Sequence, residues 1–208
     1  DNADAYLSSD DDWIEAGDGN DTIQSGLGND TVIAGFGNDQ VNLSSGNDWI
    51  IENDLSGNDT YNGGSGIDVF DCRGLGSGVD INLATGHAIN GTNNDQVVNF
   101  EYVYGTSFND TIFGTDITNV TLIGGNGNDS IAGGTGNDSI DAGNGNDTII
   151  GGTGDDLMAG KEGDDNYYVR DSGDKVIENA NEGNDTVYSY LSNYTLPGFV
   201  ENAWIAPN

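Results

Sequence analysis

Single apolar residues recur every nine residues along most of this chain, and polar, glycine-rich stretches separate them. In the first third of the sequence this position is filled by Ile14, Ile23, Val32, Val41, Ile50, Tyr61 and Phe70. The one irregular interval follows Ile50, where Glu52 and Asn53 are extra residues. Each apolar residue is the middle of a three-residue segment, which predicts a very short strand with one inward-pointing side chain.

The repeating unit is clearest between Gly124 and Tyr168, where five nine-residue units follow one another. They read GGNGNDSIA, GGTGNDSID, AGNGNDTII, GGTGDDLMA and GKEGDDNYY. The first two match the pattern G-G-x-G-x-D-x-U-x at every fixed position, where U is apolar. A single such string would be typical of a turn or a disordered linker, but five in register predict a stacked array. One unit buries nothing alone, so the fold is predicted to be an all-β solenoid.

The same unit fills the first part of the chain in a less regular form. Its copies are 7–15, 16–24, 25–33, 34–42, 43–51, 54–62 and 63–71. Position six is Asp in all of them: Asp12, Asp21, Asp30, Asp39, Asp48, Asp59 and Asp68. Trp13 and Trp49 both hold position seven, four repeats apart, so we expect them two coils apart on one edge.

The residue types in the turn favour a hard cation. Glycine at positions one, two and four allows a positive φ without a Cβ clash and leaves the turn carbonyls accessible. The Asp at position six places a carboxylate beside those carbonyls. A donor set of carbonyl and carboxylate oxygens, without nitrogen or sulfur, is the set that Ca²⁺ prefers.

The nonapeptide resembles the calcium-binding repeat of RTX proteins, the hemolysin-type repeat of secreted bacterial proteins. The resemblance implies a parallel β-roll, a right-handed β-solenoid in which two nonapeptides make one coil and repeat n lies beside repeat n+2. It implies Ca²⁺ between their turns, held by the carbonyls of positions two and four and the Asp of repeat n. The carbonyls of positions one and three and the Asp of repeat n+2 complete the site. In the second array, one ion would bind Gly125, Gly127, Asp129, Ala142, Asn144 and Asp147; the next Gly134, Gly136, Asp138, Gly151, Thr153 and Asp156; and a third Gly143, Gly145, Asp147, Gly160, Glu162 and Asp165.

The same resemblance places metal ligands in the first array. It pairs repeats 7–15 with 25–33, 16–24 with 34–42, 25–33 with 43–51, 34–42 with 54–62, and 43–51 with 63–71. The candidate ligands are Asp12, Gly17, Gly19, Asp21, Gly26, Gly28, Asp30, Ala34, Gly35, Phe36, Gly37, Asp39, Asp48, Asp59, Gly64, Gly66 and Asp68, with Asp110 in the repeat 105–113. Ser44 and Leu55 stand where the motif has glycine, which reduces backbone freedom in those turns.

The net charge indicates that folding of this chain depends on bound cations. Acidic residues number 36 against 4 Lys and Arg, which gives a formal charge of −32. Such a charge normally predicts disorder through self-repulsion. Because the acids recur at one phase, we interpret the chain as a fold that is incomplete without counter-ions. About eight bound Ca²⁺ would neutralise roughly half of the charge. We expect the chain to be largely unfolded in cytosol, where calcium is scarce, and folded outside the cell.

Composition also excludes several classes of partner. A polyanion does not bind nucleic acid or an anionic membrane by charge. No apolar run approaches a transmembrane length, and no N-terminal signal segment is apparent. Cys72 is the sole cysteine, so no intrachain disulfide forms. The chain begins at Asp1 rather than Met, which indicates a processed product or an excerpt of a longer protein.

Four segments are expected: a first array over 1–71, a spacer over 72–104, a second array over 105–188 and a C-terminal cap over 189–208. The spacer contains two strand-like runs, 79–83 and 97–103, and resembles segments that separate RTX arrays. We expect it to continue or cap the same solenoid. In a degenerate unit at 114–123, Asn119 is expected at the acid position. The repeats 169–177 and 180–188 retain Asp174 and Asp185 but few glycines.

No constellation for catalysis is present in the sequence. His87 is the sole histidine, and we expect it on a surface loop. Zinc is not expected without Cys or His clusters. Paired carboxylates are unavoidable at this acid density and carry no information about glycoside hydrolysis. The aromatic residues Trp13, Trp49, Tyr188, Tyr190 and Tyr194 could form a sugar-binding face, although edge packing along a solenoid is the simpler interpretation.

The predicted function is a calcium-binding RTX module, not an enzyme, of a secreted or cell-surface bacterial protein. By resemblance its partner is the type I secretion machinery: the unfolded chain passes the channel, and folding on Ca²⁺ outside prevents its return. Two alternatives remain open. One is a structural or adhesive rod of a surface layer, filament or adhesin that self-associates. The other is an accessory module that binds extracellular polysaccharide.

Overall fold

The computed structural model describes residues 4–6, 9–53, 56–116 and 118–207. These residues form strands, turns and bends, and no helix occurs among them. No helix in this part of the chain is therefore long and apolar enough to cross a membrane. The first two residues of the repeats 7–15 and 54–62, including Leu55, lie outside the described residues. The chain divides into two compact units, Asp1–Thr106 and Ser107–Asn208.

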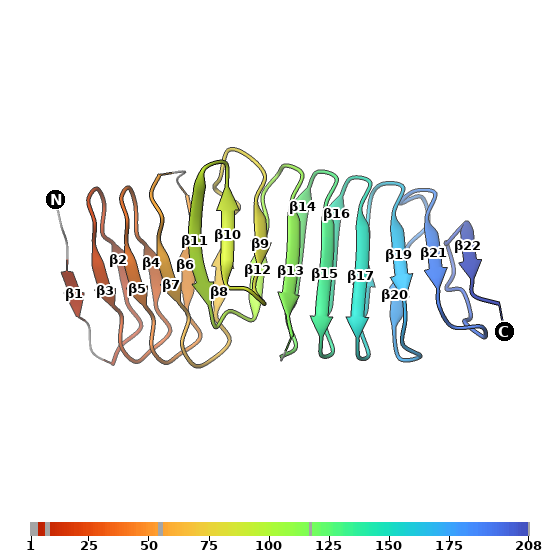
Figure 1. Ribbon diagram of the computed structural model, residues 1–208, viewed down its shortest axis with the longest axis horizontal. Coiled ribbons are helices and arrows are strands. Elements are labelled where there is room, and N and C mark those ends of the chain that lie inside the picture. The colour runs from red at the N-terminus through yellow and green to blue at the C-terminus, as the bar shows by residue number, and fades with distance from the viewer. Residues whose placement is uncertain (1–3, 7–8, 54–55, 117, 208) are drawn as a thin grey trace. The chain divides into compact units, whose positions relative to one another are not determined.

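The first unit contains two sheets whose strands alternate along the chain as far as Asp71 (Figure 1). One sheet contains, in spatial order, β1 (Asp4–Tyr6), β3 (Thr22–Gln24), β5 (Gln40–Asn42), β7 (Thr60–Asn62), β11 (Asn93–Val98), β10 (His87–Asn90) and β9 (Asp80–Asn82). The other contains β2 (Trp13–Glu15), β4 (Thr31–Ile33), β6 (Trp49–Ile51), β8 (Val69–Asp71) and β12 (Tyr102–Tyr104).

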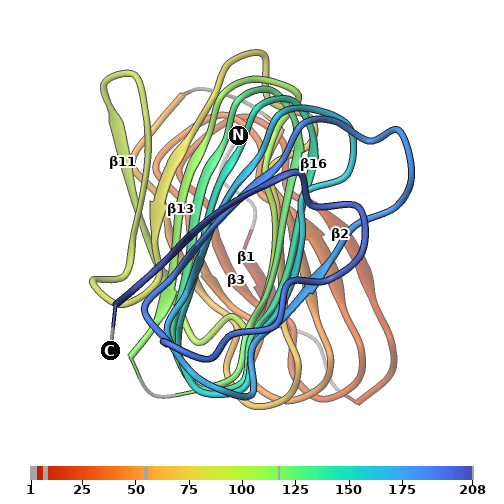
Figure 2. The same cartoon turned by 90° about the vertical axis from the view of Figure 1, so that its right-hand side faces the viewer.

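The second unit is built in the same way. One of its sheets contains β13 (Thr111–Thr115), β15 (Ser130–Thr135), β17 (Thr148–Thr153), β19 (Asn166–Val169), β21 (Thr186–Ser189) and β22 (Asn202–Ile205). The facing sheet contains β14 (Thr121–Asn126), β16 (Ser139–Asn144), β18 (Leu157–Ala159) and β20 (Lys175–Ile177). Figure 2 shows β13 and β16 on opposite sides of the flattened coil.

Strand pairing follows the repeat length. In the first unit Thr22 pairs with Gln40, and in the second Ser130 pairs with Thr148, so strands eighteen residues apart are parallel neighbours. Two nine-residue repeats therefore make one coil, and repeat n lies beside repeat n+2. This confirms the predicted all-β, parallel β-solenoid.

The core of each unit is a column of position-eight side chains. In the first unit Ile23, Val32, Ile50 and Phe70 are at most 1 % exposed. The second unit buries Ile112, Leu122, Ile131, Ile140, Ile149, Met158, Tyr167 and Val187 in the same way. Each buried aliphatic side chain contributes about 1.5–3 kcal/mol relative to exposure. The nine-residue apolar spacing thus marks the residues that hold the coils together.

The spacer is where the parallel pattern is interrupted. Strands β9, β10 and β11 form an antiparallel meander, in which His87 pairs with both Asn82 and Gln96. Beyond it, β11 pairs with β7 and β12 with β8, both parallel. The spacer thus adds strands to both sheets of the first unit. The prediction of a surface loop for His87 was wrong, because His87 begins β10 and is half-buried.

The degenerate repeat at 114–123 is also phased differently from the prediction. The backbone N–H of Val120, not of Asn119, donates to Asp138 Oδ1 at 2.9 Å. The Asn119 side chain instead accepts from the backbone N–H of Asn137. Val120 is 3 % exposed and takes the acid position, so Asn119 holds position five and the extra residue lies earlier in the turn.

Candidate metal centre

Glycine at position four is required because consecutive turns stack closely. Gly145 has φ +138°, and a Cβ on it would lie 1.6 Å from the carbonyl oxygen of Gly127, the equivalent residue one coil earlier. Gly154 faces the carbonyl of Gly136 in the same way, and Gly37 faces that of Gly19. Both the left-handed backbone and the close approach exclude a side chain at this position.

Position two keeps its left-handed backbone even where glycine is absent. Ser44 has φ 71°, Lys161 has φ 75° and Asn181 has φ 71°. Each of these residues stands at position two of its repeat. A non-glycine residue at positive φ is strained, so the stacked neighbours must determine the turn conformation there.

The Asn at position five forms a ladder between coils. Asn38 donates its backbone N–H to Asn20 Oδ1 at 2.9 Å, and Asn146 donates to Asn128 Oδ1 at 2.9 Å. Asp164 accepts equivalently from the backbone of Asn184. Each side chain at position five thus satisfies a backbone donor of repeat n+2. This role of position five was not predicted from the sequence, although the Asn-Asp pair recurs in most repeats.

The Asp at position six forms a second ladder that runs in the opposite direction. Asp129 donates its backbone N–H to Asp147 Oδ1 at 2.7 Å, and Asp147 donates to Asp165 Oδ1 at 2.8 Å. The same bond joins Asp12 to Asp30, Asp21 to Asp39, Asp30 to Asp48, Asp39 to Asp59, Asp48 to Asp68, Asp110 to Asp129 and Asp138 to Asp156. Apart from Asp110 with Asp129, these are the repeat pairs that the resemblance implied, lying side by side.

In nine position-six aspartates the second carboxylate oxygen is buried without a hydrogen bond. This holds for Oδ2 of Asp30, Asp48, Asp68, Asp129, Asp138, Asp147, Asp156, Asp165 and Asp185, each of them at most 2 % exposed. A buried carboxylate oxygen is strongly unfavourable unless a donor or a cation neutralises it. The repetition of the same orphaned atom in successive coils indicates a repeated ligand.

Carbonyl oxygens converge on the orphaned atoms. A Cβ atom placed on Gly124 would lie 2.4 Å from Asp129 Oδ2 and 2.5 Å from the carbonyl oxygen of Ala142. These two oxygens are therefore less than 5 Å apart. The equivalent point at Gly133 lies between Asp138 Oδ2 and the carbonyl of Gly151. Two ligands of one Ca²⁺ are at most about 5 Å apart, given bond lengths of about 2.3–2.6 Å.

The other predicted ligands lie along the same edge of each coil. Gly127 donates its N–H to the carbonyl of Asn144 at 2.8 Å, and Gly145 donates to that of Glu162 at 2.7 Å. The remaining bonds of this type join Gly136 to Thr153, Gly143 to Gly160, Gly17 to Ala34, Gly19 to Phe36 and Gly28 to Ser45. Gly125, Gly134, Gly26, Gly35, Gly64 and Gly66 hold positive φ in the equivalent turns. Each carbonyl keeps a second lone pair for a cation.

Burial raises the pKa of the ladder carboxyls. It raises the pKa of Asp129 and Asp165 from 3.8 to about 7, and that of Asp138 and Asp147 to about 6. Backbone hydrogen bonds to Oδ1 act in the opposite direction but do not offset the desolvation. Near neutral pH the ionised ladder is therefore unfavourable in the folded chain unless a cation compensates.

At the ends of the aspartate ladder the carboxylates have other hydrogen-bond partners. Asp174 Oδ2 accepts the backbone N–H groups of Arg170 and Asp171, both at 3.0 Å, so this worn repeat satisfies its carboxylate internally. Glu101 and Glu201 accept from the backbone of Asp68 and Asp185, where the next Asp would stand. Sequence analysis missed both residues.

Asp95 is a further rung that sequence analysis missed. Asp59 donates its backbone N–H to Asp95 Oδ1 at 2.9 Å. The string Asn94-Asp95-Gln96-Val97 retains positions five to eight of the motif, and this was the signal that could have found it. The spacer therefore carries one ladder position of its own.

The aromatic residues are mostly engaged with one another. Trp49 lies 5.8 Å from the Tyr104 ring, and Arg73 covers Tyr104 at 4.1 Å. In the second unit Tyr168 stacks on Tyr188 at 5.0 Å. Trp13 pairs with Thr31 and Thr31 with Trp49, so the two tryptophans are two coils apart on one edge, as predicted. Trp49 and Tyr188 thus pack against aromatic neighbours, whereas Trp13 is 62 % exposed.

Fold and site together define a class: a parallel β-roll whose stacked turns carry oxygen donors for calcium. The profile of the RTX calcium-binding nonapeptide repeat, which describes four copies, matches residues 6–41, 15–50, 54–70, 100–116, 123–158 and 133–167. These matches cover more than half of the chain, which belongs to the RTX calcium-binding nonapeptide repeat family. A comparison with curated proteins found no match.

Proposed function

We propose that this chain is a calcium-driven folding module that becomes ordered outside the cell and supports the secretion and stability of a larger protein. One observation carries the proposal: the column of buried Asp Oδ2 atoms without hydrogen-bond partners. Folding without calcium would bury these charges uncompensated at neutral pH, so calcium binding and folding are one equilibrium. Scarce cytosolic calcium then leaves the chain extended for export, for which the type I secretion machinery is the proposed partner.

The proposed ligand sets follow the two ladders. Each ion lies between the turns of repeats n and n+2 and takes two Asp carboxylates and four backbone carbonyls. Asp147 belongs to two such sets, one with Asp129 and one with Asp165. Each set contains only oxygen donors, which calcium prefers. Counted over the regular repeats, about eight such sets form, so about eight ions would bind.

The test is a calcium titration of the chain followed by far-UV circular dichroism and hydrodynamic radius. The proposal expects a cooperative gain of β signal with compaction, reversed by chelator and not produced by Mg²⁺, which resists dehydration and demands octahedral geometry. A chain that is folded in chelator at neutral pH, or one that stays unfolded in millimolar calcium, would overturn the proposal.

A matched pair of variants assigns the effect to position six. Asp147→Asn removes a ladder carboxylate and should raise the calcium midpoint several-fold and lower the number of bound ions. Asp164→Asn removes the same charge at position five, where Asn146 and Asn128 already make the same backbone hydrogen bond. It should leave both quantities unchanged. Equal effects of the two variants would mean that calcium responds to net charge alone.

A further inference from the structure

Two widened turns place a glutamate inside the coil, where the motif has glycine or another small residue. Glu52 and Glu178 each follow a strand directly, at the place of position one, and each is followed by Asn. Glu52 donates its backbone N–H to the carbonyl of Asp71. Leu43, which stands at position one of its repeat, donates in the same way to the carbonyl of Asn62. Both glutamates are at most 7 % exposed. The two extra residues of these turns make room for a side chain in the interior.

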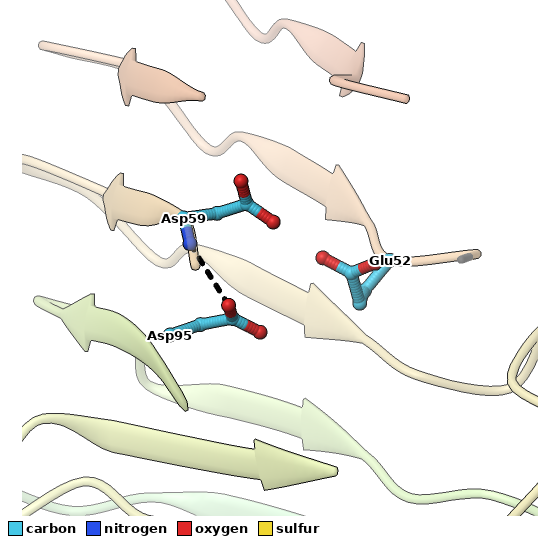
Figure 3. A group of neighbouring side chains, drawn as sticks. All are labelled: Glu52, Asp59 and Asp95. Atoms are coloured by element: carbon cyan, nitrogen blue, oxygen red, sulfur yellow. Dashed lines mark hydrogen bonds between the residues drawn. The ribbon is translucent and has the colours of Figure 1, made fainter. Parts of the chain in front are cut away.

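Each glutamate meets two ladder aspartates. In the second unit a carboxylate oxygen from each of Asp165, Glu178 and Asp185 lies within 4.8 Å of the others. In the first unit Glu52, Asp59 and Asp95 are grouped in the same way, with Glu52 facing the two aspartates across the turn (Figure 3). In both groups the two aspartates are consecutive rungs: Asp59 donates to Asp95, and Asp165 to Asp185 at 2.9 Å.

Unpartnered oxygens point to a ligand in the second group. Asp165 Oδ2, Asp185 Oδ2 and Glu178 Oε2 are all buried without a hydrogen bond. The other Glu178 oxygen accepts the hydroxyl of Tyr167, and that hydroxyl in turn accepts the N–H of Gly160 at 2.6 Å. Tyr167 thus fixes one oxygen of Glu178 and leaves the other without a hydrogen bond. Three buried carboxylates that lie together, each with one oxygen that has no hydrogen bond, need a neutralising charge.

The first group also combines a glutamate with a buried tyrosine, but here the hydroxyl reaches both the glutamate and one aspartate. Tyr61 donates to Glu52 Oε2 at 2.6 Å and lies 3.2 Å from Asp59 Oδ2. A cavity of about 10 Å³ is lined by Glu52, Asp59 and Asp95 together with apolar side chains that include Phe70, Leu75 and Val79. That volume is about what one water molecule needs.

We propose that each widened turn forms a hard-cation site of a second kind, in which Glu178 with Asp165 and Asp185, and Glu52 with Asp59 and Asp95, supply three carboxylates to one Ca²⁺. The site differs from those between regular turns because a side chain from outside the repeat motif replaces backbone carbonyls. This replacement suits the worn repeat 180–188, where Asn181 occupies a glycine position. The inference rests on the calcium-binding function proposed above and adds a ligand to it.

The distances and charge agree with calcium. Oxygens bound to one Ca²⁺ at about 2.4 Å lie at most about 4.8 Å apart, and one oxygen from each carboxylate of a group lies within 4.8 Å of the others. Three carboxylates around one divalent ion leave one negative charge, which favours calcium over a monovalent cation. The tyrosine hydroxyl, held above its usual pKa by burial, remains a neutral donor to the glutamate.

The test counts calcium ions bound to the full chain by equilibrium dialysis and native mass spectrometry, with circular dichroism to establish folding. Glu178→Gln keeps an oxygen that can accept from Tyr167 but removes the charge. It should lower the ion count by one and leave the remaining sites filled. Glu15→Gln is the matched control, because this exposed glutamate stands at position nine of its repeat, outside every proposed ligand set, and a glutamine can still accept from Trp13 Nε1. It should leave the count unchanged.

The outcomes separate this inference from the general function. A wild-type chain that binds no calcium overturns the proposed function itself. A chain that binds calcium equally with and without Glu178→Gln overturns only the glutamate site, and would mean that Glu178 is a protonated acid bonded to Tyr167. If Glu178→Gln does not fold, Glu52→Gln in the first unit provides the same count. An unchanged count there is equally contrary to the inference.

Discussion

Glycine at position four can be tested by comparing three glycine-to-alanine substitutions in increasingly restrictive environments. Gly76→Ala adds a methyl group where nothing lies within 4 Å and φ is ordinary. Gly17→Ala also meets nothing within 4 Å, but its φ is +97°. Gly145→Ala combines φ +138° with a Cβ 1.6 Å from the carbonyl oxygen of Gly127. The series separates backbone strain from the stacking of turns.

The expected magnitudes follow from these environments. Gly76→Ala should change the free energy of unfolding by less than about 0.5 kcal/mol, as for an ordinary surface position. Gly17→Ala should cost about 1–3 kcal/mol, the range for a residue held in a disfavoured φ region. In Gly145→Ala the neighbouring carbonyl must also move by about 2 Å, from 1.6 Å to the roughly 3.5 Å of ordinary contact. A shift of that size between stacked turns disturbs two nearby bonds, 2.8 Å from the Gly127 N–H to the Asn144 carbonyl and 2.7 Å from the Gly145 N–H to the Glu162 carbonyl, whose loss costs about 1 kcal/mol each. The sum is about 3–5 kcal/mol.

The assay is urea unfolding in saturating calcium, repeated at several calcium concentrations. We expect the order Gly76→Ala, Gly17→Ala, Gly145→Ala in increasing loss of stability. We also expect a raised calcium midpoint for the last, because the displaced carbonyl is a proposed ligand. Equal losses for Gly17→Ala and Gly145→Ala would refute the reasoning, because the close approach of successive turns would then contribute nothing.

Two further predictions concern pH and the core. Burial raises the pKa of Asp129 and Asp165 from 3.8 to about 7, so their contribution to the stability of the calcium-free fold is complete below pH 3.8 and is lost as pH rises through about 7. In metal-free buffer the β signal in far-UV circular dichroism should therefore be larger near pH 4 than at pH 8. Calcium affinity should fall on acidification. A calcium-free chain that is most ordered at pH 8 would contradict this prediction. Ile149→Ala, at a fully buried position, should cost about 2–5 kcal/mol in calcium, whereas Ile177→Ala, at a side chain 45 % exposed, should cost far less. Urea denaturation of the two variants measures the difference, and similar losses would mean that the position-eight column is not the core.

The regular repeats were predictable because each position has one physical task. Position eight fills the core, positions two and four turn the chain at positive φ, and position six carries the carboxylate. A period of nine then gives the strand register, since two repeats close a coil. Ile149 and Asp147 could thus be placed from sequence alone.

The departures from the repeat were not predictable, because they depend on contacts between distant residues. The antiparallel strands β9–β11 and the position of His87 depend on pairing that no local pattern specifies. Val120 takes the acid position because one residue is extra earlier in the turn, and the hydrogen-bond register alone reveals it. In the sequence Glu52 and Glu178 are only extra residues between repeats. Their burial inside the coil is evident from the structure alone.

The central claim is tested most directly by a crystal structure of the chain grown with calcium, in which anomalous scattering locates the ions. The account predicts ions between the turns of repeats n and n+2, about 2.3–2.6 Å from position-six carboxylates and from the carbonyls of both turns. The ladder atoms Asp129 Oδ2 and Asp138 Oδ2, which lack hydrogen bonds, should be among the ligands. Folded coils with no ions between the turns, or with ions only on exposed carboxylates, would contradict it.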